Sequence, residues 1–170
     1  GAAGDAIGGT PATAGDFNGD GFDDLVIATL QNRAYLVFGK ASGFAATIQL
    51  SSLDGSTGFK LSGVADSDVS GRSVSSAGDV NGDGFDDLIV GAFRNDSGGN
   101  DRGAAYVIFG KASGFGSLID LTGLAATDGF KIQGEANQNY AGFSVSSAGD
   151  VNGDGFADLI VGAPFAAANG

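Results

Sequence analysis

The chain has 170 residues, of which 20 are acidic and 8 basic, so its formal net charge is −12. It contains no Cys and no His, which excludes disulfides, Cys/His zinc sites and a histidine general base. The basic residues are scattered singly, which argues against nucleic acid, and the longest apolar stretch, residues 159–168, is far shorter than the ~20 residues that insert into a membrane.

The composition favours strands and turns over helices. Gly occurs 32 times, and each Gly inside a helix costs about 1 kcal/mol. Nineteen of the 20 acidic residues are Asp, which favours turns and supplies oxygen ligands. We therefore predict an all-β fold. Because the chain lacks an initiator Met and a signal-peptide pattern, we expect a processed product or a piece of a longer protein.

The sequence repeats with an offset of 71 residues. Residues 73–85 (SVSSAGDVNGDGF) recur unchanged at 144–156, and residues 38–44 recur at 109–115. Residues 14–22 are a related but earlier copy. The repeats predict a first unit at 1–63, a second at 64–134 and half of a third at 135–170.

Each full unit contains four short apolar runs separated by turn residues. In the second unit we predict strands at 72–77, 87–93, 104–109 and 130–133, and we expect the short run 118–121 to pack the crossing between the last two. The middle strands are apolar on both faces, as in strands between stacked sheets. Four-stranded units side by side indicate a β-propeller with blades of four antiparallel strands, about two and a half of them here.

The pattern D-x-N-G-D-G-x-x-D occurs three times and predicts a metal site in each copy. Positions 1, 3, 5 and 9 carry side-chain oxygens, and position 7 can offer its backbone carbonyl. The candidate ligands are Asp16, Asn18, Asp20, Phe22 and Asp24; Asp79, Asn81, Asp83, Phe85 and Asp87; and Asp150, Asn152, Asp154, Phe156 and Asp158. Ca²⁺ takes six to eight oxygens, so we expect three Ca²⁺ ions. Position 8 is not expected to be a ligand, because the third copy has Ala157 there.

The same pattern has two other interpretations. An EF-hand needs Glu at position 12, where the three copies have Ile27, Val90 and Val161. Ordinary hairpin turns without metal are the second alternative, since Asn-Gly and Asp-Gly favour such turns. Three carboxylates within nine residues repel one another unless a cation neutralises them, which favours the metal.

At these residues the sequence resembles the FG-GAP repeats of integrin α-chain-like propellers. The FG element is Phe38-Gly39 and Phe109-Gly110, and the GAP element is Gly162-Ala163-Pro164; residues 91–93 and 28–30 depart from it. The resemblance implies a seven-bladed propeller with Ca²⁺ in the hairpins between strands one and two. It also implies a role outside cells in adhesion and recognition.

We therefore expect a non-catalytic, calcium-stabilised extracellular segment, secreted or on a cell surface, with a composition typical of bacterial surface products. Its expected partners are further blades of a longer chain, copies of itself that pair at the exposed strand 159–161, or an extracellular protein or glycan. A propeller part of a secreted hydrolase and a lectin remain alternatives. Phe59, Phe130 and Tyr140 favour packing between blades over sugar stacking.

Overall fold

The computed structural model describes residues 7–29, 32–63 and 68–166, which are almost entirely β-structure. The strands are β1 (Ile7–Gly15), β2 (Asp24–Thr29), β3 (Arg33–Val37), β4 (Gly58–Ser62), β5 (Ser73–Gly78), β6 (Asp87–Ala92), β7 (Ala104–Ile108), β8 (Leu118–Asp120), β9 (Gly129–Gln133), β10 (Ser144–Gly149) and β11 (Asp158–Gly162). Two 3₁₀ turns, η1 (Leu50–Ser52) and η2 (Leu121–Gly123), accompany them. No helix in these ranges is long and apolar enough to cross a membrane.

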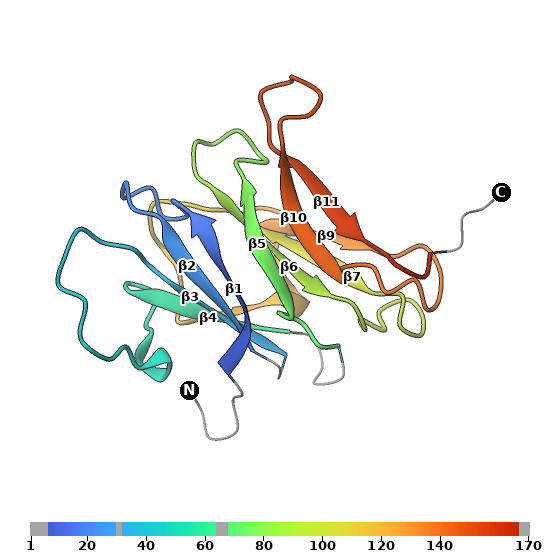
Figure 1. Cartoon of the computed structure of the whole chain (residues 1–170), viewed down its shortest axis with the longest axis horizontal. Coiled ribbons are helices and arrows are strands. Elements are labelled where there is room, and N and C mark those ends of the chain that lie inside the picture. Colours follow the sequence, from blue (N-terminus) through green and yellow to red (C-terminus); the bar gives the residue numbers. More distant parts are fainter. Residues whose placement is uncertain (1–6, 30–31, 64–67, 167–170) are drawn as a thin grey trace.

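The strands form three sheets that follow the sequence repeats. The first has the order β1-β2-β3-β4-β8, the second β5-β6-β7-β9, and the third consists of β10 and β11. Apart from β8, the strands of each repeat pair antiparallel with their neighbours in the sheet. The first strands of the three repeats, β1, β5 and β10, lie side by side (Figure 1). The fold is therefore all-β and arranged as two propeller blades and half of a third, as predicted.

The predicted strands of the second unit agree with β5, β6, β7 and β9 to within one residue at each end. Every residue of β6 and β7 is buried, which confirms that both faces of these strands are covered. Leu88 and Val90 pack in a cluster shared with the first blade, whereas Ile89 packs with Val145 of the third. The predicted boundary between residues 63 and 64 adjoins residues 64–67, which lie outside the described ranges.

The short run at 118–121 has a role that extends beyond its own blade. Its residues form β8, which pairs parallel with β4 of the preceding blade, so that Leu61 faces Ile119 in register. The equivalent residues of the first repeat, 47–49, form no strand. The connection between strands three and four of one blade therefore adds a fifth strand to the blade before it.

An aromatic cluster fills the same junction between blades. Phe115, which precedes β8, stacks on Phe59 of the first blade with ring centroids 5.3 Å apart and also lies 5.3 Å from Phe17. Phe59 is fully buried, which confirms its packing between blades, whereas its counterpart Phe130 is 39% exposed. Tyr140 lies 5.3 Å from the ring of Phe165 and so also packs against an aromatic neighbour.

Candidate metal-binding loops

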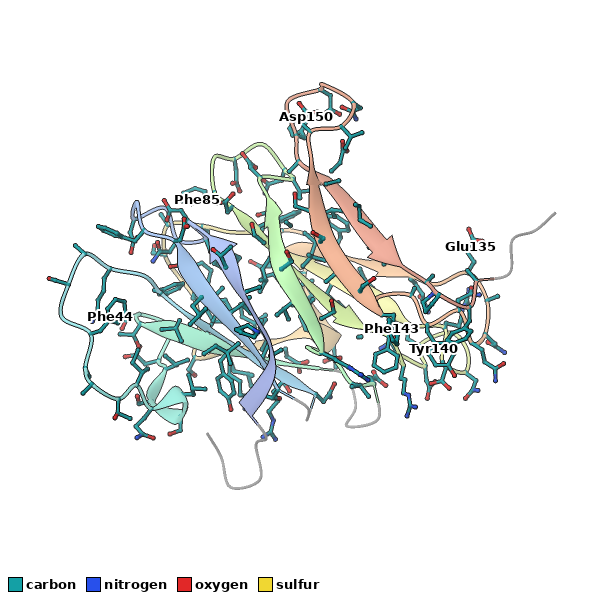
Figure 2. All side chains as sticks on the ribbon, viewed as in Figure 1. Phe44, Phe85, Glu135, Tyr140, Phe143 and Asp150 are labelled. Carbon is teal, nitrogen blue, oxygen red and sulfur yellow. The ribbon has the colours of Figure 1, made fainter. Side chains whose placement is uncertain are left out.

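The three Asp-rich segments form loops between strands one and two of each blade. These loops, at residues 16–23, 79–86 and 150–157, lie at the same end of the three sheets (Figure 1). Phe85 and Asp150 mark the second and third of them in Figure 2. The candidate ligands predicted from the sequence therefore lie at one end of the molecule, with one set in each blade.

In the first loop, side-chain oxygens accept hydrogen bonds from the backbone of a tight turn. One carboxylate oxygen of Asp16, Oδ1, accepts the N–H of Asp20 at 2.9 Å, and the other, Oδ2, accepts the N–H of Gly21 at 2.9 Å. The Oδ1 of Asn18 accepts the same N–H of Asp20 at 3.0 Å, while its Nδ2 donates to Asp20 Oδ2 at 3.0 Å. Positions 1, 3 and 5 are thus held together by short-range hydrogen bonds.

The other two loops repeat this arrangement. Asp79 accepts from the backbone of Asp83 at 3.1 Å and of Gly84 at 2.9 Å, and the same two distances recur between Asp150 and its partners at 154 and 155. The glycines at position 6 have φ of +88°, +88° and +92°, a conformation that residues with a Cβ rarely adopt. The three loops therefore share one backbone conformation that depends on glycine at position 6.

In the first two blades, the carboxylate at position 9 connects the Asp-rich loop to the turn after strand three. Asp24 is 2% exposed; its Oδ2 accepts the N–H of Phe17 at 3.1 Å and its Oδ1 accepts the N–H of Gly39 at 2.7 Å. Asp87 does the same with Val80 at 2.9 Å and Gly110 at 2.8 Å. The glycines of the two Phe-Gly pairs are thus backbone donors to the last acid of the loop.

Glycine is needed in these pairs because the loop approaches closely. A Cβ on Gly39 would lie 2.3 Å from the carbonyl oxygen of Asp23, and one on Gly110 would lie 2.4 Å from that of Asp86. A side chain at either position would push the turn away from the loop and break the N–H bond to position 9.

Burial makes the two acids at position 9 harder to ionise than an exposed aspartate. Burial raises the pKa of Asp24 to about 6, and the charge of Asp20 adds to the rise. Burial likewise raises the pKa of Asp87 to about 6, with a further contribution from Asp83. The backbone N–H bonds lower both pKa values but do not offset the desolvation.

The candidate ligand atoms suit a hard cation, although the acidic side chains of one loop do not all converge on one point in the described residues. Each loop offers only oxygen donors, which is the ligand type that Ca²⁺ prefers. In the described part of the chain, no three acidic, His or Cys side chains converge closely enough to hold a metal ion. Positions 1, 3 and 5 are brought together, but the position-9 carboxylate is held by backbone N–H groups. A carboxylate oxygen that accepts one N–H keeps a second lone-pair site, so it can also face a cation.

The sequence did not indicate what position 8 does. Asp86 Oδ2 accepts the N–H of Asp16 at 2.8 Å, so the side chain reaches the first residue of the preceding loop. Ala157, at the same position of the third loop, keeps a backbone bond from its N–H to Asp79 O at 2.9 Å. A single sequence could not show this role, because the partner of each position-8 residue lies in another repeat.

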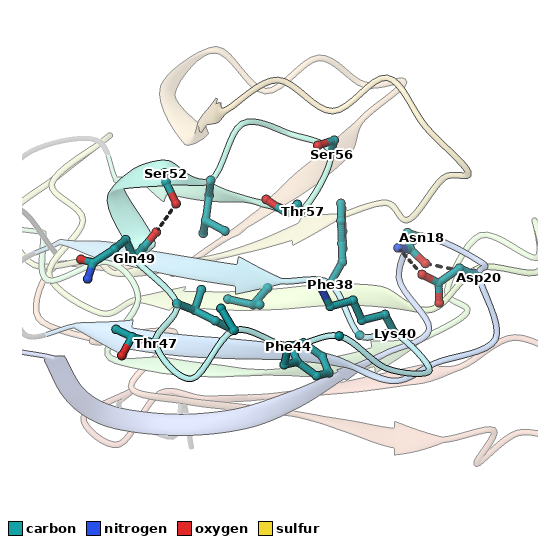
Figure 3. Close-up of a pocket in the computed structure, with 16 residues that line it drawn as sticks. Asn18, Asp20, Phe38, Lys40, Phe44, Thr47, Gln49, Ser52, Ser56 and Thr57 are labelled. Carbon is teal, nitrogen blue, oxygen red and sulfur yellow. Dashed lines mark hydrogen bonds between the residues drawn. The ribbon is translucent and has the colours of Figure 1, made fainter.

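A groove of about 450 Å³ borders the first loop (Figure 3). Asn18 and Asp20 line it together with Phe38 and Phe44, and Lys40 Nζ lies 4.9 Å from the ring centroid of Phe44. In the second blade the counterpart of Lys40 is Lys111, which forms an ion pair with Asp128 at 3.0 Å. The first blade has Thr57 in place of that acid. The two blades therefore differ in charge pairing beside their loops.

Comparison with known proteins adds a family and a set of relatives. The family model described as "FG-GAP repeat" matches residues 8–40, 70–108 and 141–170, each of which contains one Asp-rich loop. Integrin alpha-PS5 of Drosophila melanogaster is 31% identical over 168 residues, covering 94% of this chain and 15% of that protein. Integrin alpha-5 of Xenopus laevis is 30% identical over 167 residues, covering 91% of this chain and 14% of that protein.

A further relative has a different name. The phosphatidylinositol-glycan-specific phospholipase D of Bos taurus is 33% identical over 171 residues, covering 93% of this chain and 19% of that protein. The chain thus spans less than a fifth of the length of each of these three relatives. All three are animal proteins, so they give no support to the bacterial source expected from composition.

Proposed function

Because the chain belongs to the FG-GAP repeat family, we propose that it is a calcium-stabilised, non-catalytic segment of an extracellular β-propeller with a role in adhesion or recognition. The integrin alpha chains among its relatives support the adhesion role and the extracellular location. The observation that carries the calcium proposal is the recurrence of one glycine-dependent loop conformation with oxygen donors only.

In this proposal each loop holds one Ca²⁺ ion through its side-chain oxygens and one backbone carbonyl. Asp79, Asn81, Asp83 and Asp87 would supply the side-chain oxygens of the middle site, and Phe85 the carbonyl; the other two loops would use the same positions. A bound cation supplies positive charge that offsets the repulsion among the acids. The folded state would therefore gain stability from binding, since an unfolded chain lacks the site.

Thermal unfolding tests the calcium proposal directly. We expect a higher midpoint in millimolar Ca²⁺ than in EGTA, because the ions bind the folded chain. Mg²⁺ at the same concentration is the control for ionic strength and for general charge screening, and it should give a smaller rise because Mg²⁺ gives up its waters reluctantly. Equal midpoints in Ca²⁺ and EGTA would contradict a structural role for calcium.

A second candidate is the non-catalytic propeller part of a secreted hydrolase. The similarity to a phospholipase D favours it, since that relative covers 93% of the chain and integrin alpha-PS5 covers 94%. Eleven of the 20 acids lie outside the nine loop carboxylates and show no catalytic pattern. We therefore expect the isolated chain not to release a phosphatidylinositol-glycan-anchored protein from membranes. Release by the purified chain would show that it carries an active site of its own.

A further inference from the structure

Adjacent Asp-rich loops are joined to each other, and the join involves the candidate ligands themselves. Between the first and second loops, Asp86 contacts Asp16 twice. Its Oδ2 accepts the Asp16 N–H at 2.8 Å, and its own N–H points to the Asp16 carbonyl oxygen at 3.4 Å. Asp16 is position 1 of the first loop, so the second loop holds the backbone of a ligand residue in the first.

The aromatic residue at position 7 makes a second contact across the same junction. The ring of Phe85 covers Gly19, where an added Cβ would lie 2.3 Å from the ring atom Cε1. Gly19 has φ of +72° and lies between the ligand positions 3 and 5 of the first loop. The ring therefore rests on the turn that places Asn18 and Asp20.

The junction between the second and third loops has the same ring contact and the same backbone hydrogen bond, but one hydrogen bond fewer. The ring of Phe156 covers Gly82, where a Cβ would lie 2.4 Å from its Cε1. The N–H of Ala157 donates to the Asp79 carbonyl oxygen at 2.9 Å. Alanine has no side-chain acceptor, so the bond that Asp86 Oδ2 makes in the first junction has no equivalent here.

The position of these contacts links the occupancy of one loop to the shape of the next. Asp86 lies between Phe85, whose carbonyl is a candidate ligand, and Asp87, the last ligand of the same loop. A cation in the second loop would fix both neighbours of Asp86 and so restrict Asp86 as well. Because Asp86 and Phe85 hold Asp16 and Gly19, the first loop would then lose less conformational freedom when it binds its own cation.

We propose that neighbouring loops bind Ca²⁺ cooperatively and that Asp86 is the positioning residue that couples the first loop to the second. This inference rests on the proposed calcium binding. Coupling is reciprocal, so each of the two loops raises the affinity of the other. The junction between the second and third loops, which lacks the carboxylate bond, is coupled less strongly.

The test follows each loop separately in the full chain by NMR during a Ca²⁺ titration. The amides of Gly21 and Gly84 donate to the position-1 carboxylates of the first and second loops, so each reports on its own loop. Asp83→Ala removes a ligand of the second loop and leaves the first intact. We expect this variant to raise the Ca²⁺ midpoint of Gly21 by about fivefold or more, the lower end of typical coupling.

Variants of position 8 identify the residue that carries the coupling. In an Asp86→Ala background, Asp83→Ala should shift the Gly21 midpoint much less, because the bond to Asp16 is already lost. In an Asp86→Asn background the shift should remain large, because the amide oxygen can still accept that bond. Asp23→Ala is the matched control: Asp23 is position 8 of the first loop, and within the described residues its side chain has no hydrogen bond comparable to that of Asp86. Its removal should leave the shift unchanged.

The possible results separate the inference from the calcium proposal. If Gly21 and Gly84 do not respond to Ca²⁺ at all, calcium binding itself is wrong. If both respond but Asp83→Ala leaves the Gly21 midpoint unchanged, calcium binding stands and the coupling is wrong. If Asp23→Ala reduces the shift as much as Asp86→Ala does, the effect is one of overall charge and Asp86 has no positioning role.

Discussion

At the scale of single residues, the acids of one loop differ in what they stabilise. Asp87 is fully buried and accepts two backbone N–H groups, whereas Asp83 is exposed and bonds within its own turn. A buried N–H that loses its acceptor costs about 1–3 kcal/mol. Asp87 should therefore matter to the fold with or without a cation, and Asp83 mainly when a cation is bound.

We accordingly predict that Asp87→Ala lowers the unfolding midpoint even in EGTA, by an amount equivalent to about 2 kcal/mol or more. Asp83→Ala, the matched control from the same loop, should change the midpoint little in EGTA and should remove part of the gain in Ca²⁺. Chemical denaturation in both buffers measures the two free energies of unfolding. Equal losses for the two variants in EGTA would show that the bonds from Val80 and Gly110 contribute nothing.

The residue types of the loop could be predicted from the sequence, but their contacts could not. The spacing of Asp, Asn and Gly requires a tight turn with oxygen side chains around it, and the structure has that turn three times. The hydrogen bonds of position 9 to Gly39 and Gly110 depend on how strand three returns to the loop. The bond from Asp16 to Asp86 depends on how two blades pack, which no spacing within one repeat specifies.

At the scale of elements, the rings at position 7 join one loop to the next. Gly82 and Gly153 have the same φ of +77° and the same position in their loops. A Cβ on Gly82 would meet the ring of Phe156, whereas one on Gly153 has no atom of the described residues within 4 Å. The pair therefore separates the strain of the backbone from the contact between loops.

We predict that Gly82→Ala destabilises the chain more than Gly153→Ala does, by about 1–3 kcal/mol, because only the first displaces an aromatic ring. Both variants carry the same backbone strain, so the difference between their free energies of unfolding isolates the contact. Urea denaturation of the two variants and the parent chain gives this difference. If the two substitutions prove equally destabilising, the ring of Phe156 does not stabilise the junction.

The strands themselves were predictable because their apolar runs and turn residues are local. The pairing of β8 with β4 was not, since three residues carry too little pattern and their partner belongs to another blade. Phe44 and Phe115 stand at equivalent positions of the two repeats, yet Phe44 is 52% exposed and Phe115 stacks on Phe59. The two equivalent phenylalanines thus differ in environment, because within the described residues Phe115 packs on a neighbouring blade and Phe44 stays exposed.

At the scale of the whole molecule, the third sheet has an edge that no described strand covers. Among the described strands, β11 pairs only with β10, and Ile160 is 57% exposed on it. No Lys or Arg lies in β11, although charged side chains on edge strands normally prevent pairing with other chains. The net charge of −12 opposes association, and three bound Ca²⁺ ions would halve that charge to −6.

We therefore predict that the 170-residue chain associates at micromolar concentration and does so more strongly in Ca²⁺ than in EGTA. Ile160→Lys should suppress the association, because it places a charge on this edge of the third sheet. Phe44→Ser removes an exposed apolar side chain of the first blade instead and should leave association unchanged. Sedimentation velocity measures the species present, and circular dichroism checks that each variant is folded. A folded chain that stays monomeric at every concentration in Ca²⁺ would contradict the prediction that the edge of β11 drives association. If only Phe44→Ser abolished association, the contact between chains would lie on the first blade and not on β11.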